Sequence, residues 1–481
     1  MAAIVTHVMD PRPWAVAFLA VLLTMCMVCP LVMSSVPLVS GMYFLGIPPV
    51  SSMIRSLAVY YRALWYFGVT RGPYDGCPVL RGDNHVRARV HCASIGAVFA
   101  LFDKPHYRHQ TFQTDMILNL RNVAIPGTGI PLSFWSYSRT ALILAFLVWY
   151  PCLCVVAALR GVGEGAWLSS RFTSLLLAPR DWFSLWRLNC RLAALHYVKT
   201  RDNGYLLEDK WKFLLEAKEH KIPVTPWLDT GMMVVKHRNE EGGLGFYRYK
   251  NVTQGGNWII QPALHNAGDV ASLLPGDAPL STFRVLTASK LGLDSKMAGA
   301  GGDGGNDDED GGSVRTLTTV WRAGRSGATT DHVSVLFDVN KSNGKVNRGT
   351  TNQHWYQLGP FKWLTSPWTQ DIQYHDHPDT KKKIKGKVIK GMKAIVGIAE
   401  KAHRVLVPRV PLVGWDVAVT DKGILLLEGN FSCNFFMGTV DYDWYYDFCD
   451  AYFRELWGKR DKATTAPTMP APAADNRDER K

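Results

Sequence analysis

The sequence predicts an α+β protein whose N-terminal third is helical and membrane-associated. Two long uncharged runs, residues 13–54 and 141–159, predict membrane helices in that third. From Arg180 onward, short apolar strands alternate with amphipathic helices, which predicts a mixed α/β domain. Hydrophobic residues make up 47% of the 481 residues and charged residues 20%, so the chain can build a large core and is not intrinsically disordered.

The net charge of +13 is unevenly distributed along the chain. Residues 1–180 carry 14 basic and 6 acidic side chains, whereas residues 181–458 carry 34 and 31. Because the excess lies beside the apolar runs, we expect it to reflect placement against a membrane lipid bilayer. No basic face interleaved with aromatic residues is visible, so we expect no nucleic-acid partner.

Residues 1–54 form the predicted N-terminal transmembrane anchor. The apolar stretch Trp14–Met33 leaves room for one span with a re-entrant piece, or for two spans broken near Pro30 and Pro37. A secretory signal peptide is the competing interpretation. It is weakened because Arg12 alone supplies a basic n-region and the apolar run is too long.

Residues 141–160 form the predicted second transmembrane helix, with the apolar run Ala141–Leu159. A buried core helix is the alternative. If the run crosses a membrane, residues 55–140 and the residues after 160 lie on opposite faces. The intervening region 55–140 contains no catalytic constellation that we can identify, and its His and Arg residues are typical of a basic interfacial surface.

The C-terminal domain, residues 180–458, is predicted from local patterns of apolar residues and turns. The Gly-rich acidic stretch 294–313 is expected to be a disordered insertion, and residues 459–481 a disordered tail. The predicted elements are a helix in Asp209–Pro226, a short buried strand Gly231–His237, a glycine-rich hairpin Glu241–Lys250, strands Asn257–Leu264 and Ser281–Thr287, strands around residues 313–324 and 332–339, a helix after the lysine-rich stretch Lys381–Lys393, and a hairpin at residues 414–430.

Asp416, Glu428 and Asn430 form the candidate metal site. They occur in WDVAV–TDKG–ILLLEGN, which predicts two antiparallel strands joined by a tight turn. Glu428 and Asn430 are two residues apart and share one strand face, and Asp416 can lie opposite them. Two carboxylates and an amide oxygen suit Mg²⁺, with Mn²⁺ as an alternative, and a cation would offset burial beside the apolar run. An ordinary polar hairpin is the competing interpretation.

Two further sets of residues suit phosphate chemistry. Lys236 ends an apolar strand shortly before Gly242, Gly243 and Gly245, and glycines allow backbone N–H groups to approach phosphate oxygens closely. Arginines that can clamp a phosphoryl group lie on or after strands in the middle of the domain. These candidate catalytic residues are Arg284, Arg322 and Arg325.

In their order along the chain, these motifs resemble the ATP-grasp superfamily, and most closely the sugar-transfer-associated ATP-grasp group, related to α-L-glutamate ligase-like proteins. The resemblance covers roughly residues 180–457 and is most specific in GWDVAVTDKGILLLEGN. It implies an ATP-grasp fold, in which two α+β subdomains grip ATP between them. Here that fold is fused to an N-terminal helical membrane region.

The resemblance also implies roles for individual residues. Lys210 and Lys236 would contact the ATP phosphates or the adenine side, and the Gly242–Gly245 loop would close over the phosphates. The segment Gln261 to Leu264 would read adenine through its backbone. Asp416, Glu428 and Asn430 would hold Mg²⁺, and Arg284, Arg322 and Arg325 would steady the transferred phosphate. The segment after Asn430 departs from the usual Pro/Gly turn, which leaves the acceptor open.

The predicted function is therefore a membrane-anchored, ATP- and Mg²⁺-dependent ligase. It would activate a small-molecule, lipid-linked or sugar-linked carboxylate as an acyl phosphate for attack by an amine or thiol. The protein would be integral to the membrane, with the ATP-grasp domain facing the cytosol. The alternative is a non-catalytic membrane-bound sensor or scaffold that retains a nucleotide-binding fold.

Overall fold

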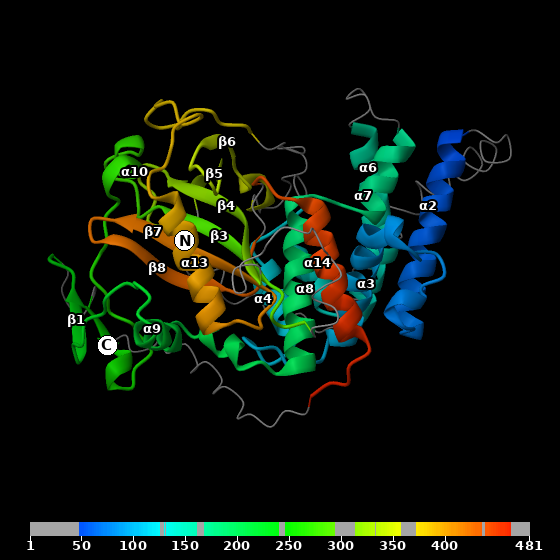
Figure 1. Cartoon of the computed structure of the whole chain (residues 1–481), viewed down its shortest axis with the longest axis horizontal. Helices are drawn as coiled ribbons and strands as arrows, with labels where there is room; N and C mark the ends of the chain where they lie inside the picture. The colour runs from blue at the N-terminus through cyan, green and yellow to red at the C-terminus, as the bar shows by residue number, and fades with distance from the viewer. Residues whose placement is uncertain are drawn as a thin grey trace.

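A sheet-based body and a helical body make up the protein, and they lie side by side in the computed structural model (Figure 1). The structure describes residues 48–125, 129, 131–160, 168–239, 246–293, 313–331, 333–356, 372–434 and 438–462. The predicted anchor stretch Trp14–Met33, the acidic insertion up to residue 312 and the tail from residue 463 lie outside these ranges, so their predictions stay predictions.

The central sheet has six antiparallel strands in the order β6-β5-β4-β3-β7-β8. Helix α13, Met392–Leu406, packs on one face through a row of apolar residues at helical spacing, among them Ile395 and Ala399. The strands are β3 (Thr282–Ser289), β4 (Val314–Gly324), β5 (Ser334–Val339), β6 (Val346–Thr350), β7 (Leu412–Thr420) and β8 (Gly423–Asn430).

A second, two-stranded sheet projects from the far end of this body (Figure 1). It pairs β1 (Met232–Lys236) with β2 (Phe246–Lys250). Three short elements flank this small sheet in sequence. Helix α9 (Lys210–Glu219) precedes it, and the turn η8 (Val252–Gln254) and the short helix α10 (Gly268–Leu273) follow it. The predicted mixture of helices and strands is confirmed, whereas the predicted pair of subdomains that grip ATP stays a prediction.

Most predicted elements of the C-terminal domain form, with two corrections. Strand β1 forms as predicted, but all five of its residues are exposed instead of buried, because its one described strand partner is β2. The predicted strand Asn257–Leu264 is wrong: this segment has no ladder and makes a single bridge, between Asn251 and Trp258. Strand β6 is an element that the sequence patterns did not single out.

The helical body contains the N-terminal third together with the last helix of the chain. Apolar side chains from both ends of the sequence share one core, which includes Phe67, Val98, Leu192 and Phe453. Its elements are α2 (Pro48–Trp65), η2 (Tyr66–Thr70), η3 (Tyr74–Gly76), η4 (Asp83–His85), α3 (Val86–Leu101), α4 (Phe112–Leu120), η5 (Leu132–Ser136), α5 (Arg139–Leu144), η6 (Ala145–Trp149), α6 (Tyr150–Arg160), α7 (Leu168–Leu177), α8 (Trp182–Thr200), η7 (Asn203–Glu208), η9 (Gln353–Tyr356) and α14 (Tyr442–Trp457).

Buried ion pairs join residues 55–140 to α14. Asp450 accepts hydrogen bonds from Tyr74 Oη at 2.7 Å and from Arg89 Nε at 2.9 Å, and all three side chains are buried. Arg454 binds the other oxygen of Asp450 at 2.8 Å. The intervening region is therefore part of the same core as the C-terminal domain, and the sequence boundaries at residues 140 and 180 do not separate two cores.

Residues 139–159 form a continuous helical rod, which is long and apolar enough to span a membrane; no other helix in the described ranges passes that test. A π-helical turn, η6, precedes Pro151. Proline at position 151 removes the hydrogen bond that the Leu147 carbonyl would receive, and that carbonyl instead accepts one from Tyr61 Oη at 2.7 Å. Only 22% of the most apolar window is buried, which differs from an ordinary core helix.

The segments before and after this apolar helix lie in one body. Helix α7 returns beside α6 and also packs against α2, so the chain re-enters the core that residues 60–123 help to build (Figure 1). This packing differs from the arrangement that a full crossing would produce, in which residues 55–140 and the C-terminal domain lie on opposite membrane faces.

Replacing Asp450 by alanine should destabilise the whole protein, because Arg89 would be left as a buried charge without its partner. We expect a loss of about 3–5 kcal/mol in the free energy of unfolding, measured by urea denaturation of the full chain. Asp75→Asn is the matched control. It removes the half-exposed pair with Arg454 and should cost about 1 kcal/mol or less. Equal losses for the two variants would contradict the buried role of Asp450.

The shared core also predicts that residues 83 and 385 face the same side of any membrane. Both positions are exposed, in η4 and in the loop before α13. Single variants Asp83→Cys and Lys385→Cys should react with an impermeant maleimide from the same side of sealed vesicles, with the wild-type protein as background. Labelling from opposite sides would show that the apolar helix separates the two segments.

Candidate functional site

The β7–β8 hairpin has the geometry predicted for the candidate metal ligands. Asp416 lies directly opposite Glu428 in the strand register, and a bulge follows at Asp416/Val417. Asn430 lies two residues further along β8, and its Nδ2 donates to Glu428 Oε1 at 3.3 Å. The two strands are joined by a tight turn in which Gly423 adopts a φ of 104°, a conformation that favours glycine. The predicted juxtaposition of the three side chains is confirmed.

Asp416 is held by two arginines from neighbouring strands. Arg284 on β3 lies beside Asp416 in register and forms a forked pair, with Nε 2.5 Å from Oδ1 and Nη2 3.1 Å from Oδ2. Arg322 on β4 approaches Oδ2 at 3.4 Å and also binds Asp331 at 3.0 Å. Burial alone would raise the pKa of Asp416, but these guanidinium groups lower it below the ordinary value. Asp416 is therefore an ionised, buried partner of two arginines.

Arg284 and Arg322 thus lie next to the candidate ligands, as part of the sheet interior. Both are buried, and the charge that was predicted to steady a phosphate is directed at Asp416. A Cβ atom at Gly414 would approach Arg284 Nη1 at 3.0 Å and Cys433 Cβ at 2.6 Å, so the close packing around the pair requires glycine there. Their proposed contact with a transferred phosphate stays a prediction.

A cleft of about 280 Å³ opens beside the edge strand β8. Glu428, Gly429 and Asn430 line one side, and Lys210 lies across from them with its Nζ 2.7 Å from Glu428 Oε2. Lys210 is the first residue of α9, which Asp209 caps through the backbone N–H groups of residues 211 and 212. The Lys210 side chain is largely exposed, and although partial desolvation opposes its charge, the Glu428 carboxylate raises its pKa. A lysine at a helix N-terminus gives this cleft a positive end suited to phosphate oxygens.

Arg108 and Glu208 complete the cleft, and sequence patterns did not identify either. Arg108 lies in the region predicted to be a basic interfacial surface, yet it lines the cleft and lies 3.6 Å from Glu208. Glu208 in turn accepts a hydrogen bond from the Phe431 backbone N–H at 3.1 Å. Burial raises the pKa of Glu208 above its usual range. The region 55–140, which was expected to be a basic interfacial surface, thus contributes Arg108 to the lining of this cleft.

A buried polar cluster adjoins Arg108. Asp115 on α4 is fully buried and lies 3.6 Å from both Arg108 and His106, and 3.7 Å from His109. Burial lowers the pKa of His106 to about 4. Asp115 is therefore neutralised chiefly by Arg108, since His106 is uncharged near neutral pH.

The other predicted site residues lie elsewhere or outside the described ranges. Lys236 is exposed at the end of β1, where its Nζ lies over the Phe246 ring, and it is not among the residues lining the cleft. Gln261 donates to the Thr225 carbonyl at 3.3 Å, and Leu264 lies on the same irregular segment. The predicted roles of Lys236, Gln261 and Leu264 stay predictions. Gly242, Gly243 and Gly245 lie outside the described residues.

Arg325 is engaged in a separate surface interaction. Its guanidinium binds both oxygens of Asp379, at 2.7 and 2.8 Å, and the Ser326 backbone N–H also donates to this carboxylate. The hydrogen bonds from Arg325 lower the pKa of Asp379 to about 2. Arg325 thus ties the turn after β4 to the loop around residue 379, and its catalytic role stays a prediction.

Comparison with known families identifies the region around the hairpin. A model described as sugar-transfer associated ATP-grasp matches residues 361–439, which contain α13, β7 and β8 with Asp416, Glu428 and Asn430. The chain resembles the ATP-grasp superfamily. Comparison with curated proteins and with solved structures gives no significant match. The predicted resemblance is confirmed in this segment.

A carboxylate and an amide, side chains of the kind that bind Mg²⁺, line the cleft, and the predicted ligand set Asp416, Glu428 and Asn430 stays a prediction. Glu428 and Asn430 present oxygens to the cleft, and the Glu428 side chain is 27% exposed. Asp416 is already neutralised by Arg284 and Arg322. Within the described ranges, no group of three or more His, Cys, Asp and Glu side chains is arranged as a metal site.

Neutralising Asp416 should cost much more stability than neutralising Glu428. Asp416→Asn leaves Arg284 and Arg322 buried with less compensation, and we expect the free energy of unfolding to fall by about 3–5 kcal/mol. Glu428→Gln affects a partly exposed pair and should cost about 1 kcal/mol or less. Urea denaturation followed by tryptophan fluorescence measures both. A similar small loss for Asp416→Asn would show that the arginines do not depend on this carboxylate.

Proposed function

We propose that this protein is an ATP-dependent ligase of the ATP-grasp class that acts on a carboxylate substrate near a membrane. The observation that carries the proposal is the cleft in which Glu428 and Asn430, from the matched segment, face Lys210 at the start of α9. A positive end for phosphates and a carboxylate–amide pair for a divalent cation both suit phosphoryl transfer.

Lys210 and the N-terminus of α9 would bind the ATP phosphates, and Glu428 and Asn430 would hold Mg²⁺. When bound, Mg²⁺–ATP supplies the phosphoryl group that converts a carboxylate into an acyl phosphate for attack by an amine or thiol. The ion pair between Lys210 and Glu428, 2.7 Å long, keeps both side chains in the cleft and charge-balanced. Binding would require Lys210 to move from Glu428 toward the phosphates, a short shift for a flexible ammonium.

In this proposal, the role of the buried ion pairs between Asp416 and the arginines Arg284 and Arg322 is to position the residues of the cleft. They join β3, β4 and β7 in the sheet interior and hold β7 beside β8, so that Glu428 and Asn430 are presented at a fixed edge. Because a ligase of this class works mainly by positioning and charge neutralisation, rigidity at this edge contributes directly to rate.

The acceptor side would be formed by the residues around Arg108. This guanidinium lies between Glu208 and Asp115 and lines the same cleft as Lys210. Arginine is well suited to orienting a carboxylate through paired N–H groups. The fused N-terminal region would thus complete the site, which explains why it shares a core with the C-terminal domain.

The apolar helix 139–159 and α2 would attach the protein to a membrane, with the ATP site facing the cytosol. Large apolar side chains are exposed on these elements, including Trp65, Ile143 and Leu159. Such a patch favours contact with lipid or with another protein. The shared core favours an apolar helix that lies in or dips into the membrane, whereas full integration would require further spans from residues outside the described ranges.

A non-catalytic nucleotide sensor is the second candidate, favoured by the engagement of Asp416, Arg284, Arg322 and Arg325 in ion pairs. Such a protein would bind ATP without producing ADP. Binding and turnover therefore separate the two proposals.

The full chain should bind ATP in a Mg²⁺-dependent manner, and Lys210→Met should weaken binding at least tenfold because it removes the charge at the phosphate end of the cleft. Lys212→Met is the matched control: this lysine lies on the same helix, is exposed and does not line the cleft. Calorimetry or equilibrium dialysis measures both. Equal affinities of the two variants would place the nucleotide elsewhere.

An ADP-release screen against pools of carboxylates and amines tests the reaction itself. Activity in the wild type that is lost in Glu428→Gln and kept in Lys212→Met would support the ligase. ATP binding without ADP release across broad pools would favour the sensor.

A further inference from the structure

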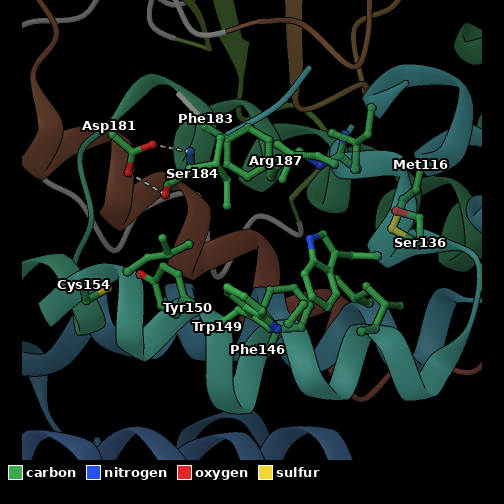
Figure 2. Close-up of a pocket in the computed structure, with 18 of the residues that line it drawn as sticks. Met116, Ser136, Phe146, Trp149, Tyr150, Cys154, Asp181, Phe183, Ser184 and Arg187 are labelled. Atoms are coloured by element: carbon green, nitrogen blue, oxygen red, sulfur yellow. Dashed lines mark hydrogen bonds between the residues drawn. The ribbon is translucent and has the colours of Figure 1, made fainter. Parts of the chain in front are cut away.

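A cavity of about 340 Å³ lies between the apolar helix (residues 139–159) and α8, apart from the cleft beside β8 (Figure 2). Aromatic side chains from the apolar helix form one wall, including Phe146, Trp149 and Tyr150, and Met116 lies across from them. A volume of this size is in the range of small-molecule sites, about 300–1,000 Å³. Walls of this composition suit a hydrocarbon chain and not a polar metabolite.

Two arginines from α8 interrupt the apolar lining. Arg187 and Arg191 are one helical turn apart, so their side chains point to the same side of α8. They are 2% and 8% exposed, respectively. Two guanidinium groups are therefore placed in a largely apolar cavity, where an uncompensated charge is strongly disfavoured.

The hydrogen-bonding capacity of these arginines is only partly used. Arg187 Nη1 lies 3.5 Å from Cys190 Sγ, and Arg191 Nη1 donates to Ser94 Oγ at 3.2 Å. Among the described residues, Arg187 Nη2 and Arg191 Nε are buried without a hydrogen-bond partner, and neither guanidinium forms an ion pair with a carboxylate.

Asp181, the acidic residue that lines the cavity, does not form an ion pair with Arg187 or Arg191. Both carboxylate oxygens of Asp181 bind Ser184, at 2.9 Å to its backbone nitrogen and 2.7 Å to its hydroxyl, as the cap of α8 (Figure 2). Burial and the adjacent charge of Arg187 lower the pKa of Arg191 to about 9.

We propose that this cavity binds an anionic amphiphile, with its carboxylate or phosphate head on Arg187 and Arg191 and its apolar chain along the aromatic wall. An anion between the two guanidinium groups would satisfy the unpartnered N–H donors and compensate the buried charge. The apolar chain would fill the remaining volume, which offers few polar groups.

The bilayer can supply such a ligand. The outer side of the same apolar helix exposes Ile143, Leu147 and Leu159, while its inner side lines the cavity. On its other side, α8 contacts the segment after Asn430: Trp186 Nε1 donates to the Ser432 carbonyl at 3.2 Å. The cavity and the cleft beside β8 share no lining residue, and the inference does not depend on the ligase proposal.

Photocrosslinking of the full chain in nanodiscs of uncharged lipid tests this inference. The probe is a 16-carbon carboxylate with a diazirine in the chain, and the labelled peptides are mapped by mass spectrometry. We expect labels in residues 139–159 and 182–200. Excess unlabelled long-chain carboxylate or monoalkyl phosphate should prevent labelling, and the stronger competitor identifies the head group. The corresponding long-chain alcohol and a short-chain carboxylate should not compete.

Variants separate ligand binding from a structural role of the arginines. Arg187→Met and Arg191→Met should reduce labelling at least tenfold, and they should leave the unfolding midpoint without ligand unchanged or raised, because a buried unpaired charge is removed. Ala157→Phe should block the chain by filling the cavity. Lys199→Gln is the control, since it removes a charge from the same helix outside the cavity.

Three results would overturn the proposal. The first is equal competition by the alcohol, the second is labelling of residues away from the cavity, and the third is normal labelling in both arginine variants. A large loss of ligand-free stability in Arg187→Met would also count against it, since that would reveal a structural counter-anion.

Discussion

The buried carboxylate of Asp416, held between Arg284 and Arg322, is the interaction on which the rest of the site depends. It joins three adjacent strands through side chains in the sheet interior, where an unpaired charge would be very costly. Because β7 is fixed in this way, β8 presents Glu428 and Asn430 at the edge of the sheet, opposite Lys210. The negative charge of Asp416 thus fixes the geometry of the cleft, while the partly exposed carboxylate of Glu428 faces Lys210.

The hairpin could be predicted from the sequence because its information is local. The alternation of residues, the short turn and the spacing between Glu428 and Asn430 fix which side chains share a face. The partners of Asp416 could not be predicted, because Arg284 lies 132 residues away and reaches it only through the order and register of the strands. Arg108 is still further from the hairpin in sequence, and nothing in its neighbourhood indicates that the loop between α3 and α4 reaches the cleft beside β8.

Two segments show the same constraint: an apolar segment need not be buried by the element that the local pattern predicts. The apolar run of β1 forms a strand, but both of its faces remain exposed because it pairs only with β2 among the described strands. The apolar helix at residues 139–159 forms as predicted, yet its flanking segments share one core. Composition reports how favourable burial would be, whereas tertiary packing decides what covers each face.

The positive charge of the N-terminal third has a second origin besides membrane placement. Arg89 pairs with Asp450 inside the core and Arg87 with Asp443 at its margin, so acids on α14 neutralise part of the excess. This charge complementarity stabilises the packing of α14 against the N-terminal helices. The pair between Arg454 and Asp75 adds to it, with the base on α14 and the acid on the N-terminal side. By contrast, Arg187 and Arg191 have no acidic partner among the described residues. Arginine therefore stabilises helix packing where an acidic side chain faces it, and it favours a bound anion where no acidic side chain does.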